Sequence, residues 1–131
     1  MDALRLRSNI KTSRNDNAGA VDDILVALNE APQDARLRTL LASAYERDGS
    51  SILAEEQYAR ALALDNNSPE VGLPMVRFLL RHGKGEQAER VLETVRERNP
   101  SNREVLTLLA QQRLARRDWV GAQEISDTLR G

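Results

Sequence analysis

The sequence predicts an all-α protein of about eight antiparallel helices, arranged as four helix-turn-helix units that repeat every 34 residues. The repeat is visible in one column of alanines: Ala20, Ala54, Ala88 and Ala122. Apolar residues recur around these alanines at the spacing of an amphipathic helix. No segment shows the sustained two-residue alternation of a half-buried strand. An array of paired helices therefore accounts for the whole chain of 131 residues.

Each unit carries two apolar stripes, one for each helix of the pair. The pattern is clearest in residues 35–68, where the first stripe follows Leu37 and Leu41. The second stripe follows Ala54 and Tyr58. Because both stripes keep helical spacing, each marks the buried side of a helix that packs against its partner.

Glycine and short polar residues mark the expected helix ends. Gly49 and Gly83 stand where the first helix of a pair must stop, because glycine readily takes the left-handed conformation that ends a helix. Side chains that can accept a hydrogen bond from a first helical turn precede the following helices, so we expect N-caps there. The candidates are Asp34, Ser50 or Ser51, Ser101 or Asn102, and Asp118.

A proline interrupts the third unit. If its first helix begins near Pro69, Pro74 has no N–H to donate to the carbonyl of Glu70. The helix then either starts late, near Gly72 or Leu73, or begins at Pro69 with a kinked first turn. We expect an irregular helix start without a functional role, because proline is tolerated in first turns.

The 34-residue helix-turn-helix resembles the tetratricopeptide repeat over essentially the whole chain. The match is best in residues 35–68, where small and large residues occupy the packing positions of the family. These residues are Leu41, Ala42, Tyr45, Gly49, Ala54, Tyr58 and Ala61. The resemblance implies a right-handed α-solenoid of four repeats, in which the alanines let paired helices approach closely. Four large residues are then expected to fill the gaps beside the alanines: Tyr45, Tyr58, Leu92 and Trp119.

The expected repeats form one domain, residues 1–131. Their bounds are 1–34, 35–68, 69–102 and 103–131. The last repeat is truncated, and it departs from the family at Arg113 and Arg117, where an aromatic residue and a glycine are usual. No polar capping helix follows it, so we expect an uncapped apolar end. The chain is then either a piece of a longer array or a module that covers its ends by association.

The composition argues against several classes of function. The 19 basic and 20 acidic residues nearly balance, which disfavours nucleic acid, and an RNA-binding solenoid would need exposed stacking aromatics. Without cysteine the chain can form neither a disulfide nor a thiolate metal site. No apolar run is long enough for a signal peptide or a membrane span. We expect a soluble chain, and the choice between cytoplasm and periplasm stays open.

No set of residues forms a recognisable catalytic site. The single histidine, His82, stands at an expected helix end and has no second histidine with which to bind a metal. The acids Asp22 and Asp23, like Glu55 and Glu56, are neighbours on a helix and point apart. We expect them to be solvated. The sequence therefore predicts no enzyme activity, no cofactor and no metal.

The family resemblance implies a binding surface on the first helix of each pair, which lines a concave groove that holds a peptide or a partner helix. The residues expected there are Arg5, Asn9, Arg36, Ser43, Arg47, Arg77, Arg81, Gln111 and Leu114. Because arginines dominate, an acidic or carboxylate-bearing protein segment is the expected ligand. In the alternative, these arginines are solvated and pair with Glu46, Glu70 and Glu104.

One ligand known for the family is not expected here. Members that bind chaperones hold a C-terminal carboxylate with Lys, Arg and Asn side chains from three repeats. Arg5 and Asn9 match this pattern, but Leu40 replaces an asparagine, and Glu70 and Pro74 replace two basic residues. An acid and a proline should repel such a ligand, so we predict that chaperone tails do not bind.

A protein–protein interaction scaffold is thus the predicted function. The arginine-rich helices resemble repeat segments of large bacterial proteins that serve envelope or exopolysaccharide secretion, which implies a place in a larger bacterial assembly. The alternative is a structural segment that stacks on further repeats or on a copy of itself. That association would use Val120, Ile125 and Leu129 on the last helix.

Overall fold

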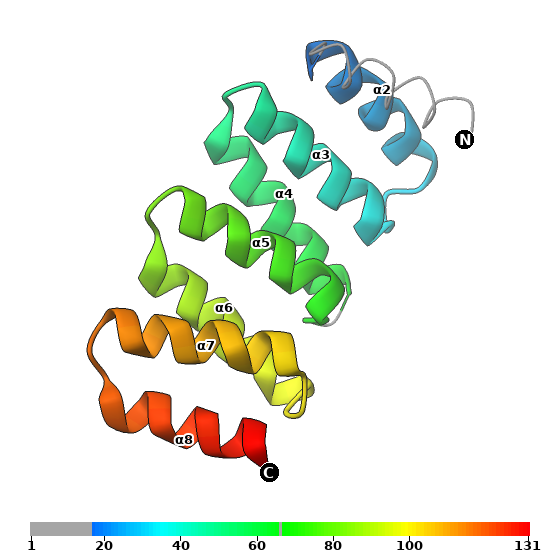
Figure 1. The fold of residues 1–131 in the computed structure, drawn as a ribbon. Helices are drawn as coiled ribbons and strands as arrows, with labels where there is room; N and C mark the ends of the chain where they lie inside the picture. Colours follow the sequence, from blue (N-terminus) through cyan, green and yellow to red (C-terminus); the bar gives the residue numbers. More distant parts are fainter. Residues whose placement is uncertain (1–16, 66) are drawn as a thin grey trace. The chain divides into compact units, whose positions relative to one another are not determined.

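The computed structural model describes residues 17–65 and 67–131, where every regular element is an α-helix (Figure 1). The first helix expected in residues 1–34 lies outside the described residues. The chain divides into two compact units, residues 1–66 and 67–131. The predicted all-α architecture is confirmed, with seven helices in the described part of the chain. None of these helices has the length and apolar character needed to cross a membrane.

The first unit contains three of the described helices: α2 (Asn17–Glu30), α3 (Ala35–Arg47) and α4 (Ser51–Leu64). Side chains from α2 and α3 form one apolar cluster. Its buried members are Ala20, Val21, Ile24, Ala27, Leu28, Leu37, Leu41 and Ala44. The helical stripes predicted from the sequence are therefore the surfaces on which these helices pack.

The second unit contains four helices: α5 (Pro69–Arg81), α6 (Gly85–Arg98), α7 (Arg103–Ala115) and α8 (Trp119–Arg130). Each helix contributes fully or almost fully buried side chains. Among them are Val76, Phe78, Leu79, Leu92, Val95, Val105, Leu106, Leu109 and Ile125. The starts of α3, α5 and α7 are 34 residues apart, as the alanine repeat requires.

The alanine column lies at the centre of the packing. Ala20, Ala54 and Ala88 are fully buried, and Ala122 is 4% exposed. A methyl group at these positions lets the helix backbones approach, and any longer side chain would overfill the contact.

Three of the four large residues expected beside the alanines are at least partly buried, but Trp119 is not. Tyr58 and Leu92 are buried, and Tyr45 packs partly buried against the first-unit cluster. Trp119 is 62% exposed, so the expectation that it fills a gap is wrong. It is the first residue of α8, where a side chain leans back toward the helix start and has no preceding helical turn to cover it.

The turns between paired helices use one backbone conformation at three equivalent positions. Gly49 has φ of +80° and Gly83 has φ of +72°, which confirms both predicted stops. The third position, again 34 residues further on, is Arg117 with φ of +62°. The fold therefore imposes a left-handed residue there even though the sequence supplies no glycine.

Most of the predicted helix caps are present. Asp34, Asn102 and Asp118 accept hydrogen bonds from the backbone N–H groups of Leu37, Val105 and Gly121, at 3.1, 3.0 and 2.9 Å. Ser50 occupies the N-cap position of α4, but its side chain makes no capping hydrogen bond. His82 is the C-cap residue of α5, and its ring lies 4.5 Å from that of Phe78.

Two expectations, the late start of the helix after Pro69 and the solvation of Asp23, are wrong. The α5 helix begins at Pro69 and continues through Pro74, so the late start is wrong. Asp23 is only 7% exposed, although we expected it to be solvated. It lies three residues after Ala20 and four before Ala27, on the buried side of α2, which explains its burial.

Candidate functional site

In the second unit, the first helix of each pair is α5 or α7. We call their combined exposed surface the first-helix face, and its residues are Arg77, Arg81, Glu104, Gln111 and Leu114. Arg77 of α5 forms an ion pair with Glu104 of α7, and both side chains are about half exposed. Because Arg77 reaches across to Glu104, these sides of the two helices adjoin. This is one of the pairings weighed as the alternative to ligand binding.

Further exposed residues lie on the same face. Arg81 follows Arg77 by one helical turn, and Gln111 follows Glu104 by two. At the end of α7, Leu114 is 49% exposed. The first-helix face therefore combines cationic, amide and apolar groups.

The first unit presents comparable residues on α3. Arg36 and Arg47 are exposed, and Ser43 is partly buried. Leu40, which replaces the family asparagine, is 45% exposed. The remaining two predicted site residues, Arg5 and Asn9, lie outside the described residues. The structure thus brings predicted residues together within the second unit, on α5 and α7.

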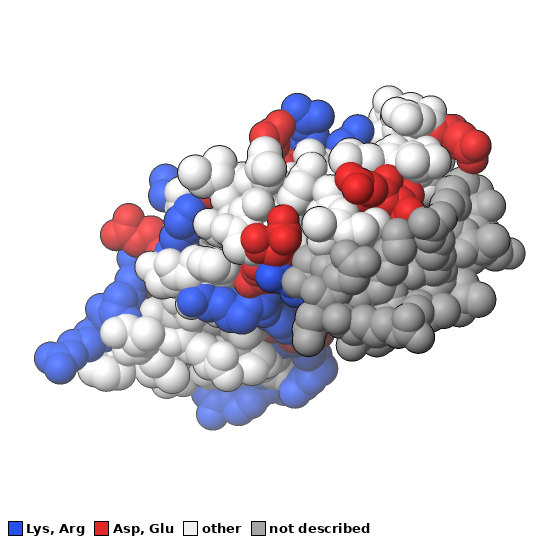
Figure 2. Space-filling model, turned by 90° about the horizontal axis from the view of Figure 1, so that it is seen from above, with Lys and Arg blue, Asp and Glu red and all other residues white. Residues whose placement is uncertain are grey.

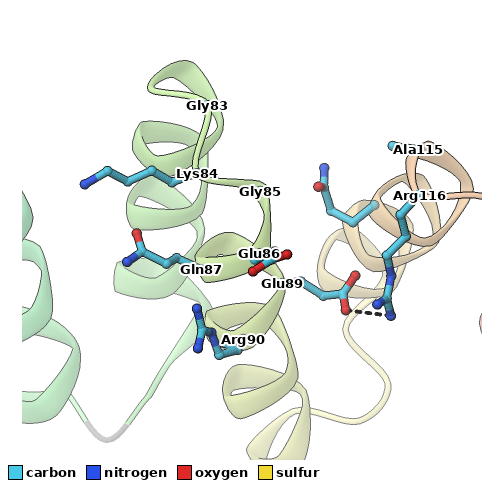
Figure 3. A pocket seen from close by; sticks show the side chains of 10 residues that line it. Gly83, Lys84, Gly85, Glu86, Gln87, Glu89, Arg90, Ala115 and Arg116 are labelled. Atoms are coloured by element: carbon cyan, nitrogen blue, oxygen red, sulfur yellow. Dashed lines mark ion pairs between the residues drawn. The ribbon is translucent and has the colours of Figure 1, made fainter.

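A polar cleft of about 890 Å³ lies between the start of α6 and the end of α7 (Figure 3). It is lined by Gly83, Lys84, Gly85, Glu86, Gln87, Glu89, Arg90, Gln112, Ala115 and Arg116. The Arg116 guanidinium lies 2.8 Å from the Glu89 carboxylate and links the two sides (Figure 3). Because three cations and two carboxylates line the cleft, neither sign dominates it.

Beside the cleft, Arg113 of α7 is the centre of a charge cluster. Its side chain is only 15% exposed and forms ion pairs with Glu93, with Glu89 at 3.8 Å and with Asp118 at 3.6 Å. A Cβ at Gly121 would overlap the Asp118 carboxylate and lie 2.6 Å from the Arg113 guanidinium, so both side chains would have to shift to admit a larger residue. Arg113 therefore connects α6, α7 and the start of α8.

Sequence reasoning did not find this cluster, although one signal pointed to it. Arg113 occupies a position where the family usually has an aromatic residue, and a large cation there needs acidic neighbours. Those neighbours, Glu89 and Glu93, come from α6 and are 20 or more residues away in sequence. Only the packing of α6 against α7 reveals which acids they are.

The three residues predicted for end-to-end association differ in their surroundings. Val120 is 74% exposed, and Leu129 is partly buried. Ile125 is 1% exposed, so it belongs to the core and not to an exposed end. It lies on the same side of α8 as Ala122 and Gly121, which faces the rest of the unit.

The last turns of α8 carry a small polar network. Asp127 accepts hydrogen bonds from Gln123 and Arg130. These bonds lower the pKa of the Asp127 carboxyl below its ordinary value, with the Gln123 bond as the larger cause. Since a lowered pKa favours the folded state only while the group is ionised, this small contribution is lost as the pH falls through that range.

The described surface carries charges of both signs (Figure 2) and lacks a cluster of metal-binding side chains. Figure 2 shows basic and acidic side chains both present on the face drawn, with uncharged surface between them. In residues 17–65 and 67–131, no group of three or more His, Asp or Glu side chains could hold a metal ion.

The comparisons with known proteins agree with this architecture. Two family models of the tetratricopeptide repeat match residues 10–69 and 53–111, and together they cover more than half of the chain. No curated protein matches the sequence significantly.

Several solved structures share the fold. The first tetratricopeptide domain of Spaghetti (RPAP3), bound to the HSP90 peptide SRMEEVD, is 25% identical with a TM-score of 0.67, over 86% of this chain and 90% of that one. The Yersinia enterocolitica type III secretion chaperone SycD, in complex with a peptide of the translocator YopD, is 18% identical with a TM-score of 0.70, over 88% and 93%. The TPR2B domain of yeast Sti1, in complex with an Hsp70 peptide, is 20% identical with a TM-score of 0.68, over 87% and 96%. The helical hairpins, their 34-residue repeat and these matches show that the chain belongs to the tetratricopeptide repeat family.

Proposed function

We propose that this protein-interaction module binds a segment of a partner protein on its first-helix face, formed by α5 and α7. The observation that carries the proposal is the ion pair between Arg77 and Glu104, which brings the exposed sides of the two helices together. The similar domain of RPAP3, which holds an HSP90 peptide, supports a peptide as the class of ligand.

The chemistry of the face suggests an acidic segment with apolar side chains. Arg77 already binds one carboxylate in a half-exposed setting, where a single ion pair contributes at most about 1 kcal/mol. A ligand carboxylate that adds a second hydrogen bond can therefore replace Glu104 as its partner. Leu114, at 49% exposure, offers apolar surface for a neighbouring ligand side chain.

Selection from a library of random displayed peptides, followed by calorimetry of the purified chain with the enriched peptide, tests this function. We expect enrichment of peptides that combine Asp or Glu with Leu or aromatic residues. Arg77→Ala and Leu114→Ala should each weaken binding about tenfold. Arg98→Ala, an exposed arginine at the end of α6, is the matched control and should leave binding unchanged. Equal losses in all three variants, or no loss in any, would refute the assignment.

We also propose that the protein works within a larger bacterial assembly, because its helices resemble repeat segments of large bacterial proteins. The structural alternative, an end that stacks on further repeats, has less support. Ile125 is buried, and exposed positions of α8 include the polar residues Gln123, Glu124 and Asp127.

A further inference from the structure

The two most exposed large apolar side chains in the described residues occupy the same position of two different repeats. Ile52 is 82% exposed and Val120 is 74% exposed, and they are 68 residues apart, which is two repeat lengths. Each is the second residue of its helix, α4 or α8. The equivalent residue between them is Glu86. Ala18 of α2 is also equivalent and exposed, but in the described repeats only Ile52 and Val120 place a large apolar side chain at this position.

The turn between α3 and α4 is acidic. We define the acidic turn patch as Asp48, Ile52, Leu53 and Glu56. Leu53 is 43% exposed, and Asp48 and Glu56 are exposed as well. Residues 48–56 contain three acids and no lysine or arginine. Glu56 pairs with Arg60 at 2.7 Å but stays about half exposed, so the patch presents aliphatic surface beside the exposed carboxylates of Asp48 and Glu56.

The turn between α7 and α8 has the opposite character. We define the basic turn patch as Arg116, Arg117, Trp119 and Val120. Arg116 remains 56% exposed at its side chain although it pairs with Glu89, and Trp119 is 62% exposed. The patch therefore presents aromatic and aliphatic surface beside positive charge.

The local structure holds the aromatic residue outward. The Asp118 carboxylate caps the Gly121 N–H at 2.9 Å and also lies 3.6 Å from the Arg113 guanidinium. These contacts fix the first turn of α8 with Trp119 at its exposed start. An exposed tryptophan on a fixed turn loses little side-chain entropy on binding, and tryptophan and arginine are enriched among residues that dominate binding energy.

We propose that the basic turn patch of one copy of this chain binds the acidic turn patch of a second copy. Each patch supplies what the other lacks: the charges are opposite, and apolar side chains on both sides can shield each other from water. The contact joins two different surfaces, so each copy offers one patch of each kind. It lies on the helix turns and does not depend on the first-helix face that we assign to peptide binding.

The first test measures self-association of the full chain. Sedimentation velocity over a wide concentration range should show a rise in mass, and more salt should weaken the association because screening reduces the attraction between the patches. Trp119 is the only tryptophan, so its fluorescence should shift to shorter wavelength as the chain associates. A chain that stays monomeric throughout, with unchanged emission, would overturn the proposal.

The second test uses three variants and their mixture. Ile52→Ser and Trp119→Ala should each weaken association about tenfold or more, whereas Val26→Ser, at another exposed valine on α2, should not. Mixing Ile52→Ser with Trp119→Ala should restore association, because the first variant keeps an intact basic patch and the second keeps an intact acidic patch. If the mixture associates no better than either variant alone, the two patches do not bind each other.

Discussion

The strained turn at Arg117 leads to our most specific stability prediction. Arg117 occupies the repeat position of Gly49 and Gly83, and all three have positive φ. An arginine side chain at φ of +62° crowds its own backbone, and glycine does not. We therefore expect Arg117→Gly to stabilise the second unit.

The magnitude follows from two opposing effects. A non-glycine residue in the left-handed conformation costs roughly 1–2 kcal/mol. Glycine makes the unfolded chain more flexible, which offsets about 0.4–1 kcal/mol of that relief. The Arg117 side chain is exposed, so its removal loses little packing. A net gain of about 0.5–1 kcal/mol, or roughly 2–4 °C in Tm, is expected.

Urea denaturation followed by circular dichroism measures this gain. Protein concentration should be kept low, since any self-association would add to the apparent stability. Gly83→Ala is the reverse experiment: no atom lies within 4 Å of a Cβ built there, so its cost comes from backbone conformation alone. A loss of about 1 kcal/mol is expected for it. If Arg117→Gly destabilises the chain while Gly83→Ala is neutral, backbone strain does not govern these turns.

Three further predictions concern packing, charge and ligand choice. Ala88 is fully buried, so Ala88→Leu should lower the unfolding free energy by about 1–3 kcal/mol, and a melting curve equal to that of the parent would contradict the packing register. Arg113→Ala should cost about 1–2 kcal/mol in urea denaturation because Glu93 loses its ion-pair partner, whereas Glu89 keeps Arg116 at 2.8 Å, and adding Glu93→Gln should recover part of that loss; strictly additive losses would show that Arg113 and Glu93 are not coupled. The HSP90 peptide SRMEEVD should give no heat of binding in calorimetry because Glu70 and Pro74 stand where basic residues are needed, and micromolar affinity would show this reasoning to be wrong.

Much of the fold could be predicted because the repeat makes local signals reinforce one another. Gly49 and Gly83 end helices through a backbone preference that acts at a single residue. Asp34 and Asn102 cap helices through hydrogen bonds that span three residues. Such interactions are complete within one helical turn, so sequence spacing alone is enough to place them.

The site was less predictable because exposure depends on neighbours that are distant in sequence. Ile125 and Trp119 are both large apolar residues of α8, but Ile125 is 1% exposed and Trp119 is 62% exposed. Helical spacing placed them only on a helix, and the packing of α8 in its unit decided which one is covered. For the same reason the turn patches around Ile52 and Trp119 were not expected.

The sequence by itself determined the family, the 34-residue period, the helix ends and the buried alanine column, because these depend on residue types at fixed short intervals. Only the tertiary structure decided which charges meet. Arg77 could have paired with several acids, and its position beside α7 selected Glu104. Arg113 forms ion pairs with Glu89 and Glu93 because α6 packs against α7. Electrostatic partners are set by distances across helices, and those distances exist only once the helices have packed.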